Sequence, residues 1–474
     1  MRKEFLAVFS GFPDHHFSEE IISRLREELT VRKSIVFITA CPNDYEQNDD
    51  DCDGMHEMFA EQGLAFEKHC VIDKRTEPFD AKKLVENADC IFLMGGGVCE
   101  DQLDLIKEKD CYEALLDCHA AIFGVSAGAM NMARNTVDFH DSMEPFPGLG
   151  LTNITVSCHH DPKDTWRYEQ TLRMSEDRPV YAMEDMSAFF IKGGKIDVTG
   201  NIYRVENRKV RLITEDDIKG LEQDEFRRVF DLIPDEFDRF RPRYSEELFD
   251  LLIDRAEIGP GKSVLEIGPG TGQATEPVLR TGCEYHAIEL GEHLYRKMEE
   301  KYGKLPNFNI VNDDFVTHDF GDMKFDMIYS AATIQWIPEE VAFAKTFKLL
   351  KPGGTLAMML TSSEYRSDNE PLFEKIQNLY DKYYKPDIPY THGKFSYTAA
   401  PEYGYSEVER FEFKGRRVFS SDEYVEFSGT HCDHIVIPES IRTEFFEGLR
   451  NAVLEAGNRI VFNDTYVLYI TKKQ

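Results

Sequence analysis

Residues 213–244, ITEDDIKGLEQDEFRRVFDLIPDEFDRFRPRY, divide the chain into two parts that each carry a glycine-rich turn. The stretch is acidic, lacks serine and has apolar residues at helical spacing, which predicts a helix and not a flexible tether. Upstream lies GVSAG at 124–128, and downstream lies EIGPGTG at 266–272. We therefore expect an N-terminal domain over 1–215, a helical linker over 216–236 and a C-terminal domain over 237–474.

Composition limits the classes of protein to consider. The chain has 474 residues, of which 42% are hydrophobic, enough for two packed cores. Its formal net charge of −32 disfavours binding to nucleic acid or to anionic membranes. No stretch approaches the roughly 18 apolar residues of a membrane span. We expect a cytoplasmic protein.

The ten cysteines contain no C-x-x-C pair and no histidine spacing typical of zinc sites. We expect reduced thiols and no metal. The run His431-Cys432-Asp433-His434 does not change this expectation, because adjacent side chains point apart.

Four short apolar runs precede the linker, at 4–11, 34–40, 90–96 and 121–126, and they are rich in β-branched and aromatic residues. They indicate buried parallel strands, and stretches with helical spacing, such as 18–32, separate them. Alternating strands and helices predict a doubly wound α/β sheet.

The last of these strands runs into a G-x-S-x-G turn at Ser126 that is followed by a helix start. Strand, turn and helix are the context of a nucleophile elbow, which presents a serine hydroxyl at the carboxyl end of a sheet. The alternative is a small-residue helix start packed on the sheet. A serine nucleophile also needs a base with an orienting acid, and Asp138, Asp141, His159 and His160 follow downstream.

Four stretches together resemble the class I glutamine-amidotransferase-like serine peptidases that include peptidase E and cyanophycinase: FLMGGGVCEDQL (92–103), IFGVSAGAMNMA (122–133), PGLGLTNITVSCHHD (147–161) and YAMEDMSAFFIKGGKIDV (181–198). The resemblance implies a flavodoxin/amidotransferase-like sheet and a short peptide or amide substrate. It also implies site residues: Ser126 as nucleophile, His159 as base, Asp141 as the orienting acid, and oxyanion donors from Gly96, Gly97 and Ala127. Asp138 and Glu184 remain alternatives for the acid.

After the linker, the apolar strand 263–267 runs into the second glycine-rich turn, and the next strand ends at Glu289. Glycines allow the backbone to approach a nucleotide-like ligand, and a carboxylate about 20 residues further on can accept ribose hydroxyls. The pattern fits either NAD or S-adenosylmethionine. The third glycine of G-x-G-x-x-G is absent, which favours the methyl donor and makes an NAD-dependent oxidoreductase the weaker hypothesis.

This half resembles the class I S-adenosylmethionine-dependent methyltransferases, and within them those related to trans-aconitate methyltransferase. The matching segments are VLEIGPGTGQAT (264–275), NIVNDDF (309–315), KFDMIYSAATIQWI (324–337) and LLKPGGTLAMM (349–359). The resemblance implies a Rossmann-like seven-stranded fold and a small-molecule methyl acceptor. The cofactor-binding residues that it implies are Glu266, Gly268, Gly270, Thr271, Gly272, Glu289, Asp313, Asp314 and Phe315. Trp336 belongs either to the acceptor pocket or to the core.

The sequence thus predicts a bifunctional fusion of a serine peptidase or amidohydrolase with a methyltransferase. The alternative is a methyltransferase joined to an inactive amidotransferase-like domain that binds or regulates.

Overall fold

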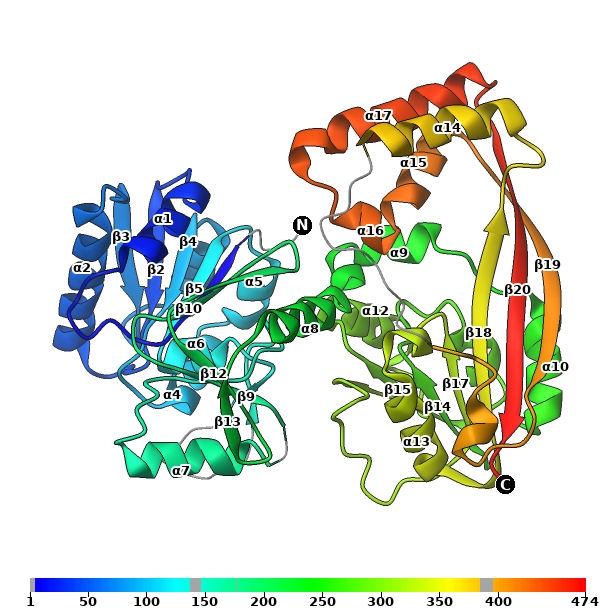
Figure 1. Cartoon of the computed structure of the whole chain (residues 1–474), viewed down its shortest axis with the longest axis horizontal. Coiled ribbons are helices and arrows are strands. Elements are labelled where there is room, and N and C mark those ends of the chain that lie inside the picture. The colour runs from blue at the N-terminus through cyan, green and yellow to red at the C-terminus, as the bar shows by residue number, and fades with distance from the viewer. Residues whose placement is uncertain (1–4, 137–145, 177, 384–394) are drawn as a thin grey trace. The chain divides into compact units, whose positions relative to one another are not determined.

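The computed structural model describes residues 5–136, 146–176, 178–383 and 395–474. The chain divides into two compact units, Met1–Phe226 and Arg227–Gln474 (Figure 1). The stretch expected to be a linker is mostly helical and is shared between them. Helix α8 (Glu215–Phe226) belongs to the first unit, and η1 (Val229–Leu232) and α9 (Pro234–Phe240) belong to the second.

The first unit is built on a sheet of seven described strands in the order β11-β10-β1-β5-β4-β2-β3. The strands β1, β5, β4, β2 and β3 are parallel, whereas β10 and β11 join as an antiparallel hairpin. The four predicted strands and the α/β class are confirmed. The bounds are β1 (Leu6–Phe9), β2 (Ser34–Ile38), β3 (Lys68–Ile72), β4 (Cys90–Leu93), β5 (Ala121–Val125), β10 (Ala188–Lys192) and β11 (Lys195–Thr199).

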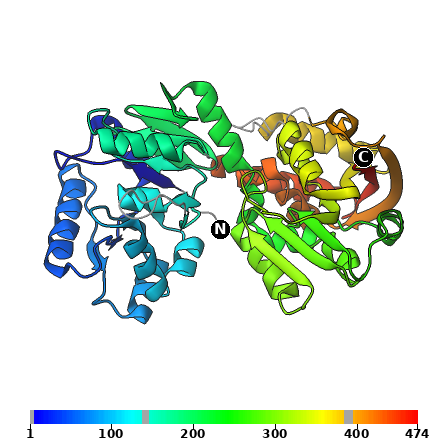
Figure 2. The same ribbon diagram turned by 90° about the horizontal axis from the view of Figure 1, so that it is seen from below.

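Alternate residues of these strands enter two separate apolar cores, because side chains of a strand point to opposite faces. One core joins Phe9, Phe37 and Phe123 to helices α1 (Glu19–Glu28) and α2 (Tyr45–Glu61). The other core joins the intervening residues to α3 (Pro78–Glu86), α4 (Cys99–Glu108) and α5 (Tyr112–Asp117). The sheet is therefore covered on both faces, as a doubly wound plan requires (Figure 2).

A smaller four-stranded sheet, β13-β12-β9-β8, completes the described first unit. Its strands are β8 (Val156–Ser157), β9 (Val180–Met183), β12 (Ile202–Glu206) and β13 (Lys209–Leu212), with helix α7 (Thr165–Met174) between the first two. The short strands β6 (Asn135–Thr136) and β7 (Phe146–Pro147) form a separate two-stranded sheet. Helix α8 is fixed to this unit, since Glu225 accepts hydrogen bonds from the Thr152 hydroxyl and the Asn153 amide, each at 2.7 Å.

The second unit contains seven described strands in the order β16-β15-β14-β17-β18-β20-β19. The first five are parallel, and β20 lies antiparallel between β18 and β19. This is the predicted Rossmann-like fold. The strands are β14 (Ser263–Ile267), β15 (Glu284–Glu289), β16 (Phe308–Asn312), β17 (Phe325–Ala331), β18 (Leu350–Glu364), β19 (Glu409–Phe419) and β20 (Ile460–Lys472). The helices beside them are α10 (Glu246–Ala256), α11 (Thr275–Leu279), α12 (Glu292–Tyr302) and α13 (Glu339–Leu349).

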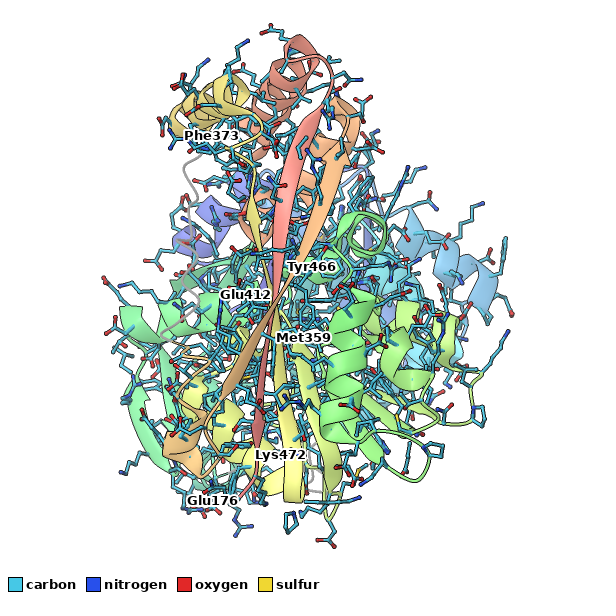
Figure 3. The ribbon with its side chains drawn as sticks, turned by 90° about the vertical axis from the view of Figure 1, so that its right-hand side faces the viewer. Glu176, Met359, Phe373, Glu412, Tyr466 and Lys472 are labelled. Atoms are coloured by element: carbon cyan, nitrogen blue, oxygen red, sulfur yellow. The ribbon has the colours of Figure 1, made fainter. Side chains whose placement is uncertain are left out.

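The long strands β18, β19 and β20 extend to a group of helices with its own apolar core. The group comprises α14 (Glu370–Tyr383), α15 (Ser421–Gly429), α16 (Cys432–Ile435) and α17 (Glu439–Glu455) (Figure 1). Figure 3 shows Met359, Tyr466 and Lys472 along the strands and Phe373 among these helices. The short turns η2 (Ile334–Trp336) and η3 (Ala400–Tyr403) complete the described elements. Within the described ranges, no helix combines the length and the apolar character needed to cross a membrane.

Candidate functional site

Ser126 stands in a sharp turn between β5 and helix α6 (Ala127–Asn131). Its backbone has φ 55° and ψ −118°, a conformation that residues with a side chain rarely adopt. The two flanking glycines are needed for close packing. A Cβ at Gly128 would lie 2.1 Å from the Leu93 carbonyl oxygen, and one at Gly124 would lie 2.7 Å from the Gly128 carbonyl oxygen. The turn therefore has the strained geometry of a nucleophile elbow.

Two side chains complete a hydrogen-bonded chain with Ser126. The His159 Nε2 atom is 2.8 Å from Ser126 Oγ, and His159 Nδ1 is 2.6 Å from Asp185 Oδ1. His159 follows β8 and Asp185 follows β9. Because a carboxylate accepts the proton on Nδ1, Nε2 of the neutral ring carries a lone pair and can accept the serine proton.

The end of β1 supports the histidine and the aspartate. Ser10 is fully buried, and its Oγ accepts a hydrogen bond from the His159 amide at 2.7 Å and donates one to the Met183 carbonyl at 2.9 Å. Gly11 leaves no room for a side chain, because a Cβ there would lie 2.5 Å from Asp185 Oδ1 and 2.6 Å from the His159 ring. Neither Ser10 nor Gly11 was predicted from the sequence.

The acid that orients His159 in the described structure is Asp185, a residue not predicted from the sequence. Asp141 and Asp138 lie outside the described residues. Glu184 accepts hydrogen bonds from Asn201 and from the Tyr203 hydroxyl, at 2.8 and 2.9 Å. Asp185 directly follows Glu184, which the sequence had offered as an alternative acid, and both residues come just after β9.

The loop after β4 supplies the glycines beside Ser126. A Cβ at Gly95 would lie 2.8 Å from the Ser126 Cβ, and one at Gly97 would lie 2.0 Å from the Ala40 carbonyl oxygen. Gly96 has φ 90°, which favours glycine. Gly95 therefore packs against Ser126, and Ala127 follows the serine at the start of α6. The assignment of Gly96, Gly97 and Ala127 as oxyanion donors stays a prediction.

The second unit carries its own glycine-rich turn after β14. Gly268, Gly270 and Gly272 have φ of 64°, 61° and 92°. A Cβ at Gly268 would lie 2.3 Å from the Thr333 methyl carbon, and one at Gly270 would lie 2.9 Å from the Phe237 ring. Only glycine fits these positions, so the loop exposes backbone where other residues would place side chains.

This loop borders a cavity of about 690 Å³ within the second unit. The predicted site residues that line it are Gly268, Gly270, Glu289, Asp313, Asp314, Phe315 and Trp336. Glu266, Thr271 and Gly272 were also predicted to bind the cofactor, but they are not among the described residues that line this cavity. Glu266 instead lies fully buried, where it accepts hydrogen bonds from the Thr275 hydroxyl at 2.6 Å and from the Tyr285 hydroxyl, and burial raises its pKa to about 6.

Glu289 joins the end of β15 to the loop. Its carboxylate accepts hydrogen bonds from the Gly270 amide at 2.9 Å and the Gly291 amide at 3.0 Å. Burial raises the pKa of this carboxyl group to about 7 although both amides favour the charged form. The cavity therefore contains an acceptor group whose charge changes near neutral pH.

The predicted linker contributes a wall of the cavity, which the sequence analysis missed. Arg227 forms a bidentate ion pair with Asp314, with N–O distances of 2.8 and 2.9 Å. Asp231 binds the His293 ring at 2.8 Å and the Leu294 amide at 3.0 Å. Helical spacing predicted a helix here, but it does not show which surface the helix covers.

The part of the cavity lined by Phe230, Phe237 and Arg241 is aromatic and cationic. Arg241 stacks on Phe230 and Phe237, with its guanidinium carbon 5.4 and 5.3 Å from the ring centroids. Burial lowers the pKa of this guanidinium, and no ion pair to a carboxylate is found for it among the described residues. Trp336 lies edge-on to Phe230, 5.7 Å between centroids. A guanidinium at a cavity wall without a carboxylate ion pair among the described residues favours an anionic ligand.

His431 also faces this end of the cavity. Its Nδ1 is 3.0 Å from the Ser428 carbonyl oxygen, so this nitrogen donates and Nε2 carries the lone pair. Burial, with Arg241 and His434 nearby, lowers the His431 pKa to about 3 and keeps the ring neutral. In the part of the chain that the structure describes, residues 431–434 do not converge as metal ligands.

Each unit matches the model of a known protein family. Residues 5–199 match the model of Peptidase family S51, and residues 265–358 match that of a Methyltransferase domain. The chain carries both domains. The resemblances noted in the sequence are confirmed.

Individual relatives cover one domain each. An uncharacterized methyltransferase-like protein of Schizosaccharomyces pombe is 22% identical over 40% of this chain and 71% of its own length. Sterol 24-C-methyltransferase of Saccharomyces cerevisiae is 30% identical over 26% of this chain, which spans 34% of that enzyme. The crystal structure of a peptidase from an acI-B1 Actinobacterium covers 44% of this chain and 93% of its own, at 16% identity and a TM-score of 0.35.

Proposed function

We propose that the protein is a bifunctional enzyme. The S51 domain hydrolyses a short peptide or amide through Ser126, and the second unit transfers a methyl group from S-adenosylmethionine to a small molecule. The observation that carries the first activity is the hydrogen-bonded chain Ser126–His159–Asp185 on a strained turn.

The hydrolytic mechanism uses these three side chains and the adjacent backbone. His159 Nε2 accepts the proton of Ser126 Oγ as the oxygen attacks the substrate carbonyl carbon. Backbone amides of the glycine loop and of Ala127 stabilise the negative charge on the carbonyl oxygen. The imidazolium, stabilised by Asp185, then gives its proton to the leaving amine. Water hydrolyses the acyl-serine by the same proton transfers in reverse, and the serine is regenerated.

Several features of the second unit fit S-adenosylmethionine, which supplies an electrophilic methyl group when bound. The positive φ of Gly268 and Gly270 leaves the backbone open to a ligand, and Glu289 lies at the end of the strand next to β14. We assign the ribose hydroxyls to Glu289 and the adenine amino group to Asp313 or Asp314. The cavity of about 690 Å³ has room for the cofactor and a small acceptor.

We assign the acceptor to the end of the cavity that contains Trp336, Arg241 and His431. The Arg241 guanidinium suits a carboxylate, which either the amino-acid part of the cofactor or the acceptor supplies. The neutral His431 ring presents a lone pair and therefore suits a hydroxyl or amine hydrogen of the acceptor. Methyl transfer needs chiefly the alignment of nucleophile and methyl carbon, which the side chains lining the cavity can provide.

Reaction with a fluorophosphonate probe tests the hydrolase directly. We expect stoichiometric labelling of the wild-type chain and none of Ser126→Ala. Labelling that persists in Ser126→Ala would show that Ser126 is not the nucleophile. A wild-type chain that is not labelled, yet binds S-adenosylhomocysteine in calorimetry, would favour a methyltransferase whose S51 domain only binds or regulates.

A further inference from the structure

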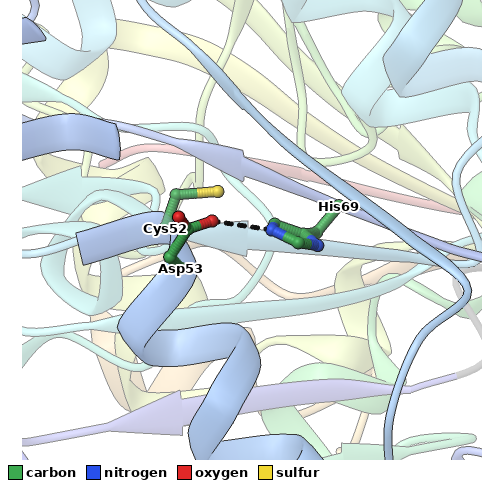
Figure 4. A group of neighbouring side chains, drawn as sticks. All are labelled: Cys52, Asp53 and His69. Atoms are coloured by element: carbon green, nitrogen blue, oxygen red, sulfur yellow. Dashed lines mark hydrogen bonds and ion pairs between the residues drawn. The ribbon is translucent and has the colours of Figure 1, made fainter. Parts of the chain in front are cut away.

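A second group of reactive side chains lies in the first unit, apart from the Ser126 site. Cys52 and Asp53 are on helix α2, and His69 is on β3 (Figure 4). The Cys52 sulfur, an Asp53 carboxylate oxygen and a His69 ring nitrogen all lie within 4.8 Å of one another. His69 Nε2 is 2.8 Å from Asp53 Oδ1. A thiol, a carboxylate and an imidazole from two different elements thus converge on one point.

The position is open to incoming ions. Strand β3 is at the edge of the seven-stranded sheet, and a cavity of about 550 Å³ adjoins the three side chains. Cys52 itself is buried, whereas Asp53 and His69 are exposed. A bound ion would therefore have protein on one side and solvent on the other.

The charges nearby favour a cation and identify the available acid. Residues 48–54 of α2 read NDDDCDG. Asp49 and Asp73 are held by Arg75, with N–O distances of 2.6 and 2.7 Å. Among the residues that the structure describes, Asp53 makes no arginine pair, and its hydrogen-bond partner is the His69 ring. Asp53 is therefore the carboxylate that can turn to a metal without breaking an arginine ion pair.

The imidazole is also held in place. The rings of His56 and His69 stack with centroids 4.0 Å apart and an interplanar angle of 14°. His56 Nε2 in turn is 3.0 Å from the Phe66 carbonyl oxygen. This stacking fixes the plane of His69 and directs Nε2 toward Asp53. An oriented imidazole is what a metal site requires of a histidine ligand.

We propose that Cys52, Asp53 and His69 form a binding site for a divalent transition-metal cation of the zinc class, with its remaining coordination position open to solvent. The mixed sulfur, nitrogen and oxygen donors suit Zn²⁺ or Co²⁺, whereas Ca²⁺ and Mg²⁺ require oxygen ligands. Binding releases the Cys52 thiol proton, and the neutral His69 ring carries its proton on Nδ1, so that the Nε2 lone pair and the Asp53 carboxylate both face the metal. Three protein ligands with one open position are the arrangement of zinc sites that keep a water or an exogenous ligand.

Titration of the chelator-treated, desalted full chain with Co²⁺ and Zn²⁺ tests the proposal. We expect one equivalent of Co²⁺ to produce a thiolate-to-cobalt charge-transfer band, which Zn²⁺ then displaces. Cys52→Ser removes the band, and His69→Gln weakens Zn²⁺ binding by at least about tenfold in competition with a chromophoric chelator. The control Asp50→Asn, an exposed acid on the same helix, leaves both readouts unchanged.

Because Cys52 is buried and its replacement can affect folding, the exposed variant His69→Gln provides an independent arm. A charge-transfer band that survives in Cys52→Ser would overturn the proposal. Unchanged Zn²⁺ affinity in a folded His69→Gln variant would also overturn it, as would the absence of binding by the wild-type chain. Binding of Ca²⁺ but not of Zn²⁺ or Co²⁺, with equal affinity in all variants, would also overturn the proposal, because it would reflect only the acidic surface of α2.

Discussion

The turn at Ser126 and the turn at Gly268–Gly272 share one local structure but present different chemical groups. Both follow a buried parallel strand and lead into a helix, and both require positive φ. In the first, the positive-φ residue is a serine, so the strain presents a hydroxyl. In the second, the positive-φ residues are glycines, so the turn presents backbone and leaves space for a ligand. A serine at the positive-φ position therefore suits a nucleophile, whereas glycines at the positive-φ positions suit the binding of a ligand.

The surroundings of the two turns differ in the same sense. Ser126 has its partners in place, with hydrogen bonds of 2.8 and 2.6 Å through His159 to Asp185. The second turn borders a cavity where the Arg241 guanidinium and the His431 lone pair face space that a ligand can fill. The proposed hydrolase site thus has its side chains in hydrogen-bonded positions, whereas the proposed cofactor site presents polar groups to a cavity. Four substitutions test this contrast, from the largest expected effect to the smallest.

Asp185→Asn should reduce kcat of the hydrolase about 10⁴-fold, because an amide in place of the carboxylate favours the wrong histidine tautomer. The measurement is turnover of a chromogenic amide by a chain with an unchanged circular dichroism spectrum. Glu184→Gln is the matched control, since its carboxylate bonds Asn201 and Tyr203 instead. Equal losses in both variants would mean that the loop, and not the Asp185 carboxylate, matters.

Gly268→Val should reduce S-adenosylhomocysteine affinity by at least about 100-fold, because its side chain would meet Thr333 and close the approach to the backbone. Isothermal calorimetry measures this loss. Gly261→Ala is the control: it also has positive φ, 83°, but a Cβ there meets nothing within 4 Å. The control should cost about 1 kcal/mol of stability and leave affinity unchanged. Equal affinity losses in both would point to backbone strain alone.

The affinity for S-adenosylhomocysteine should rise with pH through about 7, where Glu289 ionises. The free carboxyl has its pKa raised from 4.5 to about 7, so below pH 7 the proton must leave before two hydroxyls can donate to it. We expect affinity to fall by up to about tenfold per pH unit below 7. Glu289→Gln should bind more weakly and with a flat pH profile between 5.5 and 8. A wild-type profile that is flat over that range would contradict the role given to Glu289.

Ser10→Ala should lower kcat of the hydrolase by about tenfold with little change in KM, because it removes the bond that fixes the His159 backbone. Ser10→Thr, which keeps the hydroxyl, should recover part of the rate if the larger side chain is accommodated. Loss of stability equal in both variants, without a change in kcat, would reduce Ser10 to a packing role.

The sequence predicted the strands and turns because their signals are local. Short apolar runs predicted β1, β2, β4, β5 and β14, and the glycine-rich turns after β4, β5 and β14 pointed to the two folds. Asp185 was missed because it comes from a loop after β9, and spacing from the serine pointed to Asp141 instead. Arg227 and Arg241 were missed because helical spacing does not show that a predicted linker forms the wall of a cavity. Cys52 and His69 come from different elements, and no spacing motif relates them.

Tryptic mass spectrometry of the phosphonate-treated chain, with S-adenosylhomocysteine calorimetry on the same sample, tests most directly that the two sites act separately. We predict a single adduct on Ser126 and an unchanged dissociation constant for the nucleoside. An adduct on another residue, or labelling that abolishes nucleoside binding, would contradict two independent sites in one chain.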